Sequence, residues 1–151
     1  HHRTPNIITS LELDPAEMEK RNIHLQKKYA EIEENEVRFE ELHCEDSEYL
    51  IVAFGSCARI AQKAMEMARE EGIKVGLLRP ITLWPFPSKA IAARAAQVKG
   101  ILTVELNAGQ MVEDVRLAVK CKVPVEHFGR LGGIVPDPDE VITALKEKLI
   151  K

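Results

Sequence analysis

Hydrophobic positions are sparse near the start of the chain and become dense and regular after it. A helix start is marked by Asp14, which can cap free amides, by Pro15, which suits the first helical position, and by Glu17, which completes a capping-box-like pair. We expect this helix to run to about Asn35. Four apolar side chains lie along it at near-heptad spacing: Met18, Leu25, Tyr29 and Ile32. So thin an apolar seam is not enough for the helix to bury itself alone.

From residue 49 onward, continuous apolar runs alternate with amphipathic stretches. Residues 49–54 (YLIVAF) form an unbroken apolar run before Gly55, which is typical of a strand buried on both faces. Three later segments are expected to be strands: 74–81, 100–106 and 124–129. Four segments are expected to be helices: 57–71, 88–97, 110–120 and 137–150. This alternation predicts parallel strands joined by right-handed helical crossovers, and therefore a three-layer α/β/α sandwich.

Two further segments complete this organisation. Residues 37–43 (VRFEELH) are interpreted as a short strand whose acidic content suits an edge position. Prolines make residues 79–87 a stiff, irregular connection, after which Ser88 is expected to cap the next helix. The predicted domain organisation is an N-terminal connecting segment with the long helix, 1–36, followed by the α/β domain, 37–151.

Length and composition narrow the class of protein. A chain of 151 residues with 45% hydrophobic and 30% charged residues is typical of one soluble, globular, cytoplasmic domain. No apolar run approaches the roughly 20 residues of a membrane helix, and no signal-peptide core is present at the N-terminus. A net charge of -3 provides no basic field for phosphates. We therefore expect neither a membrane nor a nucleic acid as a partner.

The cysteines and histidines predict no metal site. Cys44, Cys57 and Cys121 stand far apart, without a CxxC pair and without histidines at metal-ligand spacing. Free thiols in a reducing compartment are the simplest interpretation. His1 and His2 are compatible with a purification tag or with native sequence, and no prediction rests on them.

The turn after the first buried strand is one candidate ligand site, because helix amides at a strand end can hold an anion. In one hypothesis Gly55 and Ser56 form an anion loop and the helix start lowers the pKa of Cys57, which would suit a thiol enzyme. In the other, Ser56 caps the helix and Cys57 is a packed residue, since no general base follows in the sequence. The turn has neither GxGxxG spacing nor a GK[ST] ending.

Two later turns are further candidates. Glu105, Asn107 and Gln110 lie at a strand exit, where they either touch a substrate or neighbouring subunit or form a hydrogen-bonded helix start. Residues 129–133 (GRLGG) offer one cation in a flexible loop that either grips an anion or is a simple turn. The candidate residues of this loop are Arg130, Gly132 and Gly133.

The segment at 79–87 offers contact residues and no reaction centre. Trp84, the only tryptophan, sits among prolines, where it either contacts a partner or packs on the domain itself. Arg79 precedes it at a predicted strand end. No paired acid and base, triad or metal cage is visible anywhere, so we predict no catalytic, cofactor-binding or metal-binding residue.

Three motifs carry a family resemblance: RPITLWPFP at 79–87, VELNAGQM at 104–111 and GRLGG at 129–133. In this order, over roughly residues 37–151, they resemble the C-terminal domain of the alpha-type subunit of 2-oxoacid:ferredoxin oxidoreductases. The upstream stretch NIITSLELDPAEMEKRNIHLQKKYAEIE resembles the connecting segment of the branch that acts on 3-methyl-2-oxobutanoate, also called 2-oxoisovalerate.

The resemblance implies a transketolase C-terminal-like fold, a five-stranded, mostly parallel sheet with an antiparallel first strand, which agrees with the edge position expected for 37–43. It implies that the whole enzyme uses thiamine diphosphate, magnesium, iron-sulfur clusters and coenzyme A to decarboxylate a 2-oxoacid oxidatively and reduce ferredoxin. The regions that bind these cofactors are absent from this chain, and the three cysteines could not ligate a cluster.

The resemblance also implies that the chain is a fragment, because it begins too late to hold the N-terminal domain of such a subunit. Its expected partners are that domain, the other subunits and, indirectly, ferredoxin. We expect a role in assembly and active-site shaping, with no turnover by the fragment alone. Contacts near the interface or substrate are expected from residues at the loop ends: Arg79, Trp84, Glu105, Asn107, Gln110 and Arg130. The alternative is a free-standing module that binds anions or nucleotides through Gly55, Ser56 and residues 129–133.

Overall fold

The structure, a computed structural model, describes residues 11–150. Its contacts divide the chain into two units, one ending at Asn35 and the other beginning at Glu36. His1 and His2, and the start of the connecting segment up to residue 10, lie outside the described residues.

In its described residues, 11–35, the first unit contains the helix α1 (Pro15–Asn35), and the start of this helix confirms the cap expected at Asp14. One carboxylate oxygen of Asp14 accepts hydrogen bonds from the backbone N–H groups of Ala16, at 2.8 Å, and Glu17, at 3.2 Å. The Lys20 ammonium donates to the Glu17 carboxylate at 2.6 Å, whereas the expected capping box would have Glu17 accept from the backbone at Asp14. No side chain of α1 is buried, as its thin apolar seam predicted.

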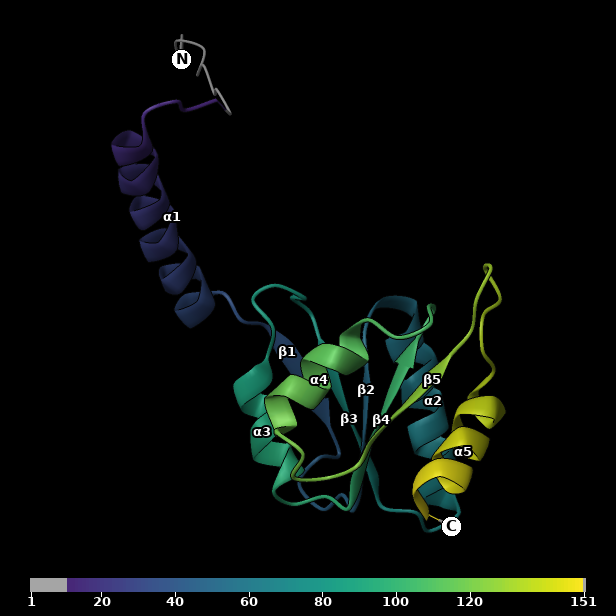
Figure 1. Ribbon diagram of the computed structural model, residues 1–151. Coiled ribbons are helices and arrows are strands. Elements are labelled where there is room, and N and C mark those ends of the chain that lie inside the picture. The colour runs from purple at the N-terminus through teal and green to yellow at the C-terminus, as the bar shows by residue number, and fades with distance from the viewer. Residues whose placement is uncertain (1–10, 151) are drawn as a thin grey trace, which may run out of the picture. The chain divides into compact units, whose positions relative to one another are not determined.

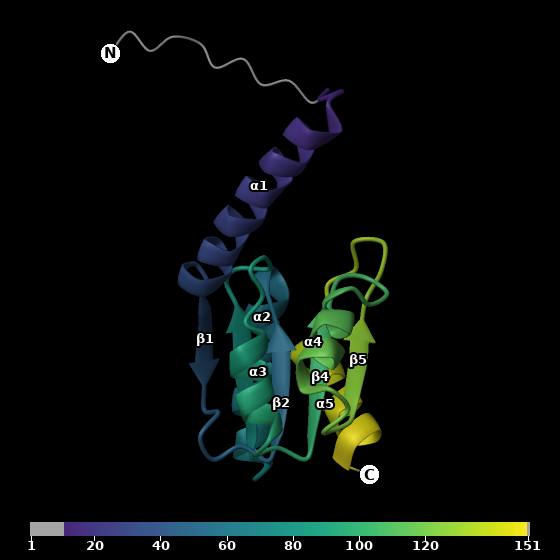
Figure 2. The same cartoon turned by 60° about the vertical axis from the view of Figure 1, so that its left-hand side comes forward.

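The second unit is built on a five-stranded sheet with the strand order β1-β3-β2-β4-β5 (Figures 1 and 2). The strands are β1 (Phe39–Leu42), β2 (Tyr49–Ala53), β3 (Val75–Pro80), β4 (Gly100–Glu105) and β5 (Val125–Gly129). β1 pairs antiparallel with β3, and all other pairs are parallel. The mixed sheet with an antiparallel edge strand is thus confirmed.

Helices cover both faces of this sheet and make three layers (Figures 1 and 2). α2 (Gly55–Glu70) and α5 (Pro138–Leu145), which continues as the π-helix η1 (Lys146–Ile150), pack on one face. α3 (Ser88–Ala95) and α4 (Met111–Val119) pack on the other. The three-layer α/β/α sandwich predicted from the alternation is therefore confirmed.

The unbroken apolar runs of the central strands follow from this layering. Neighbouring residues of a strand point to opposite faces, so Leu50 packs under α3 and α4 while Ile51 packs under α2 and α5. In β3, Leu77 lies on the α2 and α5 side and Leu78 on the α3 and α4 side. Both faces of β2 and β3 are buried, and a polar residue in either strand would lose water without gaining a partner.

Two expected helix caps are wrong. Ser56 and Ser88 lie inside the first turns of α2 and α3, and the capping positions are Phe54 and Pro87, which give no side-chain hydrogen bond. Gly55, with φ 56°, turns the chain into α2 directly after the strand, so the helix begins before the serine.

Within residues 11–150, no helix combines the length and the apolar character that crossing a membrane would need.

The central position of Leu102 in β4 gives a test of the core. Leu102 is fully buried, and Leu102→Ala should lower the free energy of unfolding by about 3 kcal/mol because it removes packed methyl groups and leaves a cavity. Urea denaturation followed by circular dichroism measures the change. Leu117→Ala is the matched control, since Leu117 is 74% exposed and its truncation should shift the unfolding free energy by about 0.5 kcal/mol or less. Equal effects of the two variants would contradict the assigned core.

Candidate functional site

The parallel strands β2 to β5 end at the same edge of the sheet, and the sequence-predicted site residues gather there (Figure 1). We call this the carboxyl edge: the start of α2 at 54–56, the loops at 81–87, 106–110 and 130–137, and the start of the antiparallel β1. Each predicted residue lies at a strand end or in one of these loops: Gly55, Ser56, Arg79, Trp84, Glu105, Asn107, Gln110, Arg130, Gly132 and Gly133. The fold brings them to one edge, and four of them form a cluster joined by hydrogen bonds: Glu105, Asn107, Gln110 and Arg130.

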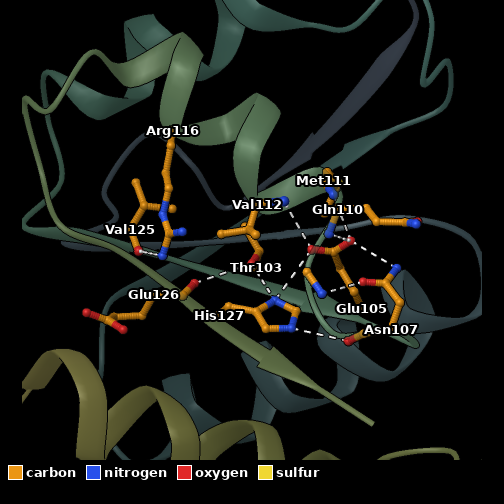
Figure 3. Close-up of polar contacts among 11 residues, drawn as sticks. Thr103, Glu105, Asn107, Gln110, Met111, Val112, Arg116, Val125, Glu126 and His127 are labelled. Atoms are coloured by element: carbon orange, nitrogen blue, oxygen red, sulfur yellow. Dashed lines mark hydrogen bonds and ion pairs between the residues drawn. The ribbon is translucent and has the colours of Figure 1, made fainter. Parts of the chain in front are cut away.

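The centre of this cluster is the carboxylate of Glu105, the last residue of β4 (Figure 3). Its side chain is completely buried. The backbone N–H groups at the start of α4 donate to it: Gln110 at 3.3 Å, Met111 at 2.8 Å and Val112 at 3.0 Å. The side-chain amide of Asn107 donates a further bond at 3.2 Å.

The position of Glu105 explains why a carboxylate is tolerated in the interior. The first amides of a helix lack partners and carry partial positive charge, and α4 begins a few residues after β4 ends. Glu105 satisfies three of these amides, which compensate its loss of water. The anion site at the start of α4 is therefore filled by the protein's own side chain.

His127 in β5 also belongs to the cluster, and the sequence analysis missed it. Its Nδ1 lies 3.2 Å from the Thr103 hydroxyl and 3.4 Å from a Glu105 carboxylate oxygen, and its Nε2 lies 3.2 Å from the Asn107 carbonyl oxygen (Figure 3). His127 and Thr103 are directly paired in the β4–β5 register. The pairing of β4 with β5 is what places His127 beside Glu105. His127 belongs to no sequence motif, so nothing in the sequence alone indicated this contact.

The strand end of β5 is closed tightly onto the loop after β4. A side chain at Gly129 would place its Cβ 2.2 Å from the Asn107 carbonyl oxygen, so only glycine fits. Asn107 in turn accepts a hydrogen bond from the Gly109 N–H at 2.7 Å, and the Arg130 N–H donates to the Glu105 carbonyl oxygen at 3.2 Å. Asn107 is thus a structural member of the cluster.

Arg79 and Arg130 lie on opposite flanks of the carboxyl edge. The Arg79 guanidinium pairs with Glu40 at 2.9 Å, and that of Arg130 pairs with Glu140 at 3.5 Å. In each case the buried Nε has no hydrogen-bond partner among the described residues. Gln110, by contrast, uses its backbone in the cluster and leaves its side chain exposed.

Of the two hypotheses for Cys57, the one with a lowered pKa is wrong, and the one with a packed residue agrees with the structure. Its thiol is only 3% exposed, and burial, followed by the negative charge of Glu105, raises the pKa of Cys57. Both causes act against the thiolate, so Cys57 does not have the environment of a reactive thiol. Gly55 and Ser56 remain exposed at that helix start.

The described residues do not fit a metal centre. Within residues 11–150, no three His, Cys, Asp or Glu side chains come together to ligate a metal ion. Cys44 and Cys57 are buried in separate core clusters, while Cys121 is exposed. The three cysteines therefore do not converge on a site that could hold an iron-sulfur cluster.

Comparisons with known proteins identify the family of the chain. The sequence model of the family described as pyruvate:ferredoxin oxidoreductase core domain II matches residues 47–141. The chain is 48% identical over 142 residues to ketoisovalerate oxidoreductase subunit VorB of Methanothermobacter thermautotrophicus, covering 94% of this chain and 40% of that protein. It therefore spans 40% of the length of this curated relative.

Solved structures give the same picture of the fold. The 2-oxoglutarate:ferredoxin oxidoreductase from Magnetococcus marinus matches with a TM-score of 0.77 and 25% identity, over 90% of this chain and 24% of that one. A split-gene transketolase matches with a TM-score of 0.64 and 20% identity, over 75% of this chain and 41% of the other. The second likeness concerns the fold alone, and it agrees with the transketolase C-terminal-like prediction.

The buried carboxylate can be tested by Glu105→Gln. This change should lower the free energy of unfolding by on the order of 3 kcal/mol, because an amide N–H₂ would face amide donors that the carboxylate now satisfies. Chemical denaturation measures the loss. Glu113→Gln removes the same charge from an exposed position in the first turn of α4 and should change the unfolding free energy little. Similar values for both variants would refute the capping role.

The cysteines differ in predicted reactivity. Burial, followed by the charge of Glu41, raises the pKa of the Cys44 thiol from 9.0 to about 11, and Cys57 is shifted in the same direction. Titration of the folded chain with a chromogenic disulfide at neutral pH should show one fast thiol, Cys121, and two that react only on unfolding. Cys121→Ser should abolish the fast phase, and a fast phase that survives this change would show that a buried thiol is reactive.

Proposed function

Since this chain belongs to the family of pyruvate:ferredoxin oxidoreductase core domain II, we propose that it is a domain of the alpha-type subunit of a thiamine-diphosphate-dependent 2-oxoacid:ferredoxin oxidoreductase. The observation that carries the proposal is the similarity to a ketoisovalerate oxidoreductase subunit, which extends over almost the whole chain. In the complete enzyme, a 2-oxoacid would lose carbon dioxide, its acyl group would pass to coenzyme A and its electrons would pass to ferredoxin.

We propose 3-methyl-2-oxobutanoate as the substrate of the whole enzyme. The similarity to the ketoisovalerate oxidoreductase subunit extends upstream of the family match, which begins at residue 47, and so includes much of the connecting segment. The solved 2-oxoglutarate enzyme shares the fold at lower identity. A branched, uncharged side chain on the 2-oxoacid is the chemistry that this similarity supports.

The proposed role of this domain is assembly and shaping of the active site. Its fully buried carboxylate, that of Glu105, holds the start of α4, and the described cysteines and acids form no cofactor cage. Thiamine diphosphate, magnesium and the iron-sulfur clusters would be bound by the N-terminal domain of the subunit or by other subunits. Thiamine diphosphate, where it binds, supplies the carbanion chemistry of the decarboxylation. Ferredoxin would be reached only through those parts, and a cytoplasmic location suits the free cysteines.

Activity measurements test this proposal. The chain alone, given 3-methyl-2-oxobutanoate, coenzyme A, thiamine diphosphate, magnesium and ferredoxin, should show no ferredoxin reduction. The enzyme assembled with all its subunits should do so, with a kcat/KM at least about tenfold higher than for 2-oxoglutarate, whose second carboxylate would have to lose water in an apolar pocket.

Two results would contradict it. The first is turnover by the chain alone. The second is calorimetric binding of phosphate, coenzyme A or adenine nucleotides by the chain alone, which the free-standing anion-binding alternative predicts from the exposed start of α2 at Gly55 and Ser56.

A further inference from the structure

Exposed large hydrophobic side chains are concentrated on the carboxyl edge. Among residues 36–150, every one of them except Leu117 lies there. We call this set the apolar rim: Phe39, Ile81, Leu83, Trp84, Leu106, Leu131, Ile134 and Val135. Phe39 belongs to it because β1 runs antiparallel, which brings its first residue opposite Pro80 at the end of β3. Exposed apolar residues scattered singly need no explanation, but their restriction to one edge marks an interaction surface.

The loop after β3 is held in a conformation that presents apolar side chains outward. The Thr82 hydroxyl donates to the Pro85 carbonyl oxygen at 2.8 Å and accepts from the Arg38 N–H at 3.0 Å. Pro85 is buried, whereas Leu83 and Trp84 just before it are exposed, Trp84 by 55%. The hydrogen bonds of Thr82 therefore hold the loop in a conformation that exposes these two side chains. Aromatic and apolar side chains of this kind are enriched at the centre of protein interfaces.

Unpartnered donors accompany the apolar rim. The buried Nε atoms of Arg79 and Arg130 are the side-chain polar atoms in the described chain that are buried without a hydrogen-bond partner, and both lie on this edge. These Nε atoms are covered, but the side chains of Arg79 and Arg130 are 43% and 38% exposed, so a partner placed here can bring acceptor oxygens to the outer nitrogens of both guanidinium groups. The nearest carboxylates, Glu40 and Glu140, already pair with the guanidinium groups, and Glu105 is buried.

We infer, on the basis of the proposed function, that the apolar rim is the docking surface for another domain of the same subunit. That domain presents apolar side chains to the rim and acceptor oxygens to Arg79 and Arg130. The curated relative is more than twice as long as the match, so a large part of such a subunit is joined covalently to this domain. The covalent link keeps that part at high effective concentration, which favours it over a separate molecule as the cover of the rim.

Footprinting of the assembled enzyme tests the inference. Hydroxyl-radical labelling with mass spectrometry should show that Leu83, Trp84, Leu131 and Ile134 lose most of their reactivity in the assembled enzyme relative to the chain alone. Leu117, on the outer surface of α4, is the internal reference outside the rim. Rim residues that stay as reactive in the active enzyme as in the free chain would overturn the inference while leaving the proposed function intact. A chain that is not incorporated into an active enzyme would overturn both.

Paired variants identify the occupant. Leu83→Ser and Ile134→Ser should leave the urea midpoint of the free chain unchanged, because both side chains are exposed. In the assembled enzyme each should raise the rate of proteolysis between this domain and the rest of the subunit about tenfold, since interface anchors dominate docking. Leu117→Ser should leave that rate unchanged. If sedimentation shows that the free chain dimerises and that Leu83→Ser abolishes the dimer, a second copy occupies the rim and the inference is wrong.

Discussion

The carboxylate of Glu105, buried against the first amides of α4, is the interaction on which the functional edge of this domain depends. It joins the end of β4 to the helix that follows, and through Asn107 and His127 it reaches the loop after β4 and the neighbouring strand β5. A buried charge is tolerated only where donors surround it, so the geometry of these segments is mutually constrained. Gly129 completes the constraint, because only a residue without a side chain lets β5 end against the Asn107 carbonyl.

Loops at strand ends often provide both polar groups that bind ligands and surface that contacts other proteins, and in this domain the two are separate. Helix starts at the carboxyl ends of parallel strands commonly receive ligands, but here the start of α4 is occupied internally. What the edge offers outward is apolar surface, such as Leu83 and Leu131, with arginines on its flanks. An edge built in this way is suited to packing against another protein surface, which is the basis of the proposed docking role.

Much of the fold could be predicted because its signals are local. Continuous apolar runs identified β2 and β4, since both faces of these strands are covered, and the capping residue Asp14 located the start of α1. The wrong predictions concern features that neighbours in space control. Ser56 is not the cap of α2, because the helix starts at Gly55, two residues earlier than a Ser56 cap requires. The pKa of Cys57 is raised by its burial and by the charge of Glu105.

The sequence by itself determined the order of strands and helices, their layering and the family resemblance, because periodicity and short motifs are properties of contiguous residues. The tertiary structure alone decided that Glu105 is a cap rather than a ligand-binding group, that His127 stands beside it and that the exposed hydrophobic side chains share one edge. Those facts depend on the register between β4 and β5 and on where distant loops meet. Register and loop packing are set by long-range contacts, which leave no periodic trace in the chain.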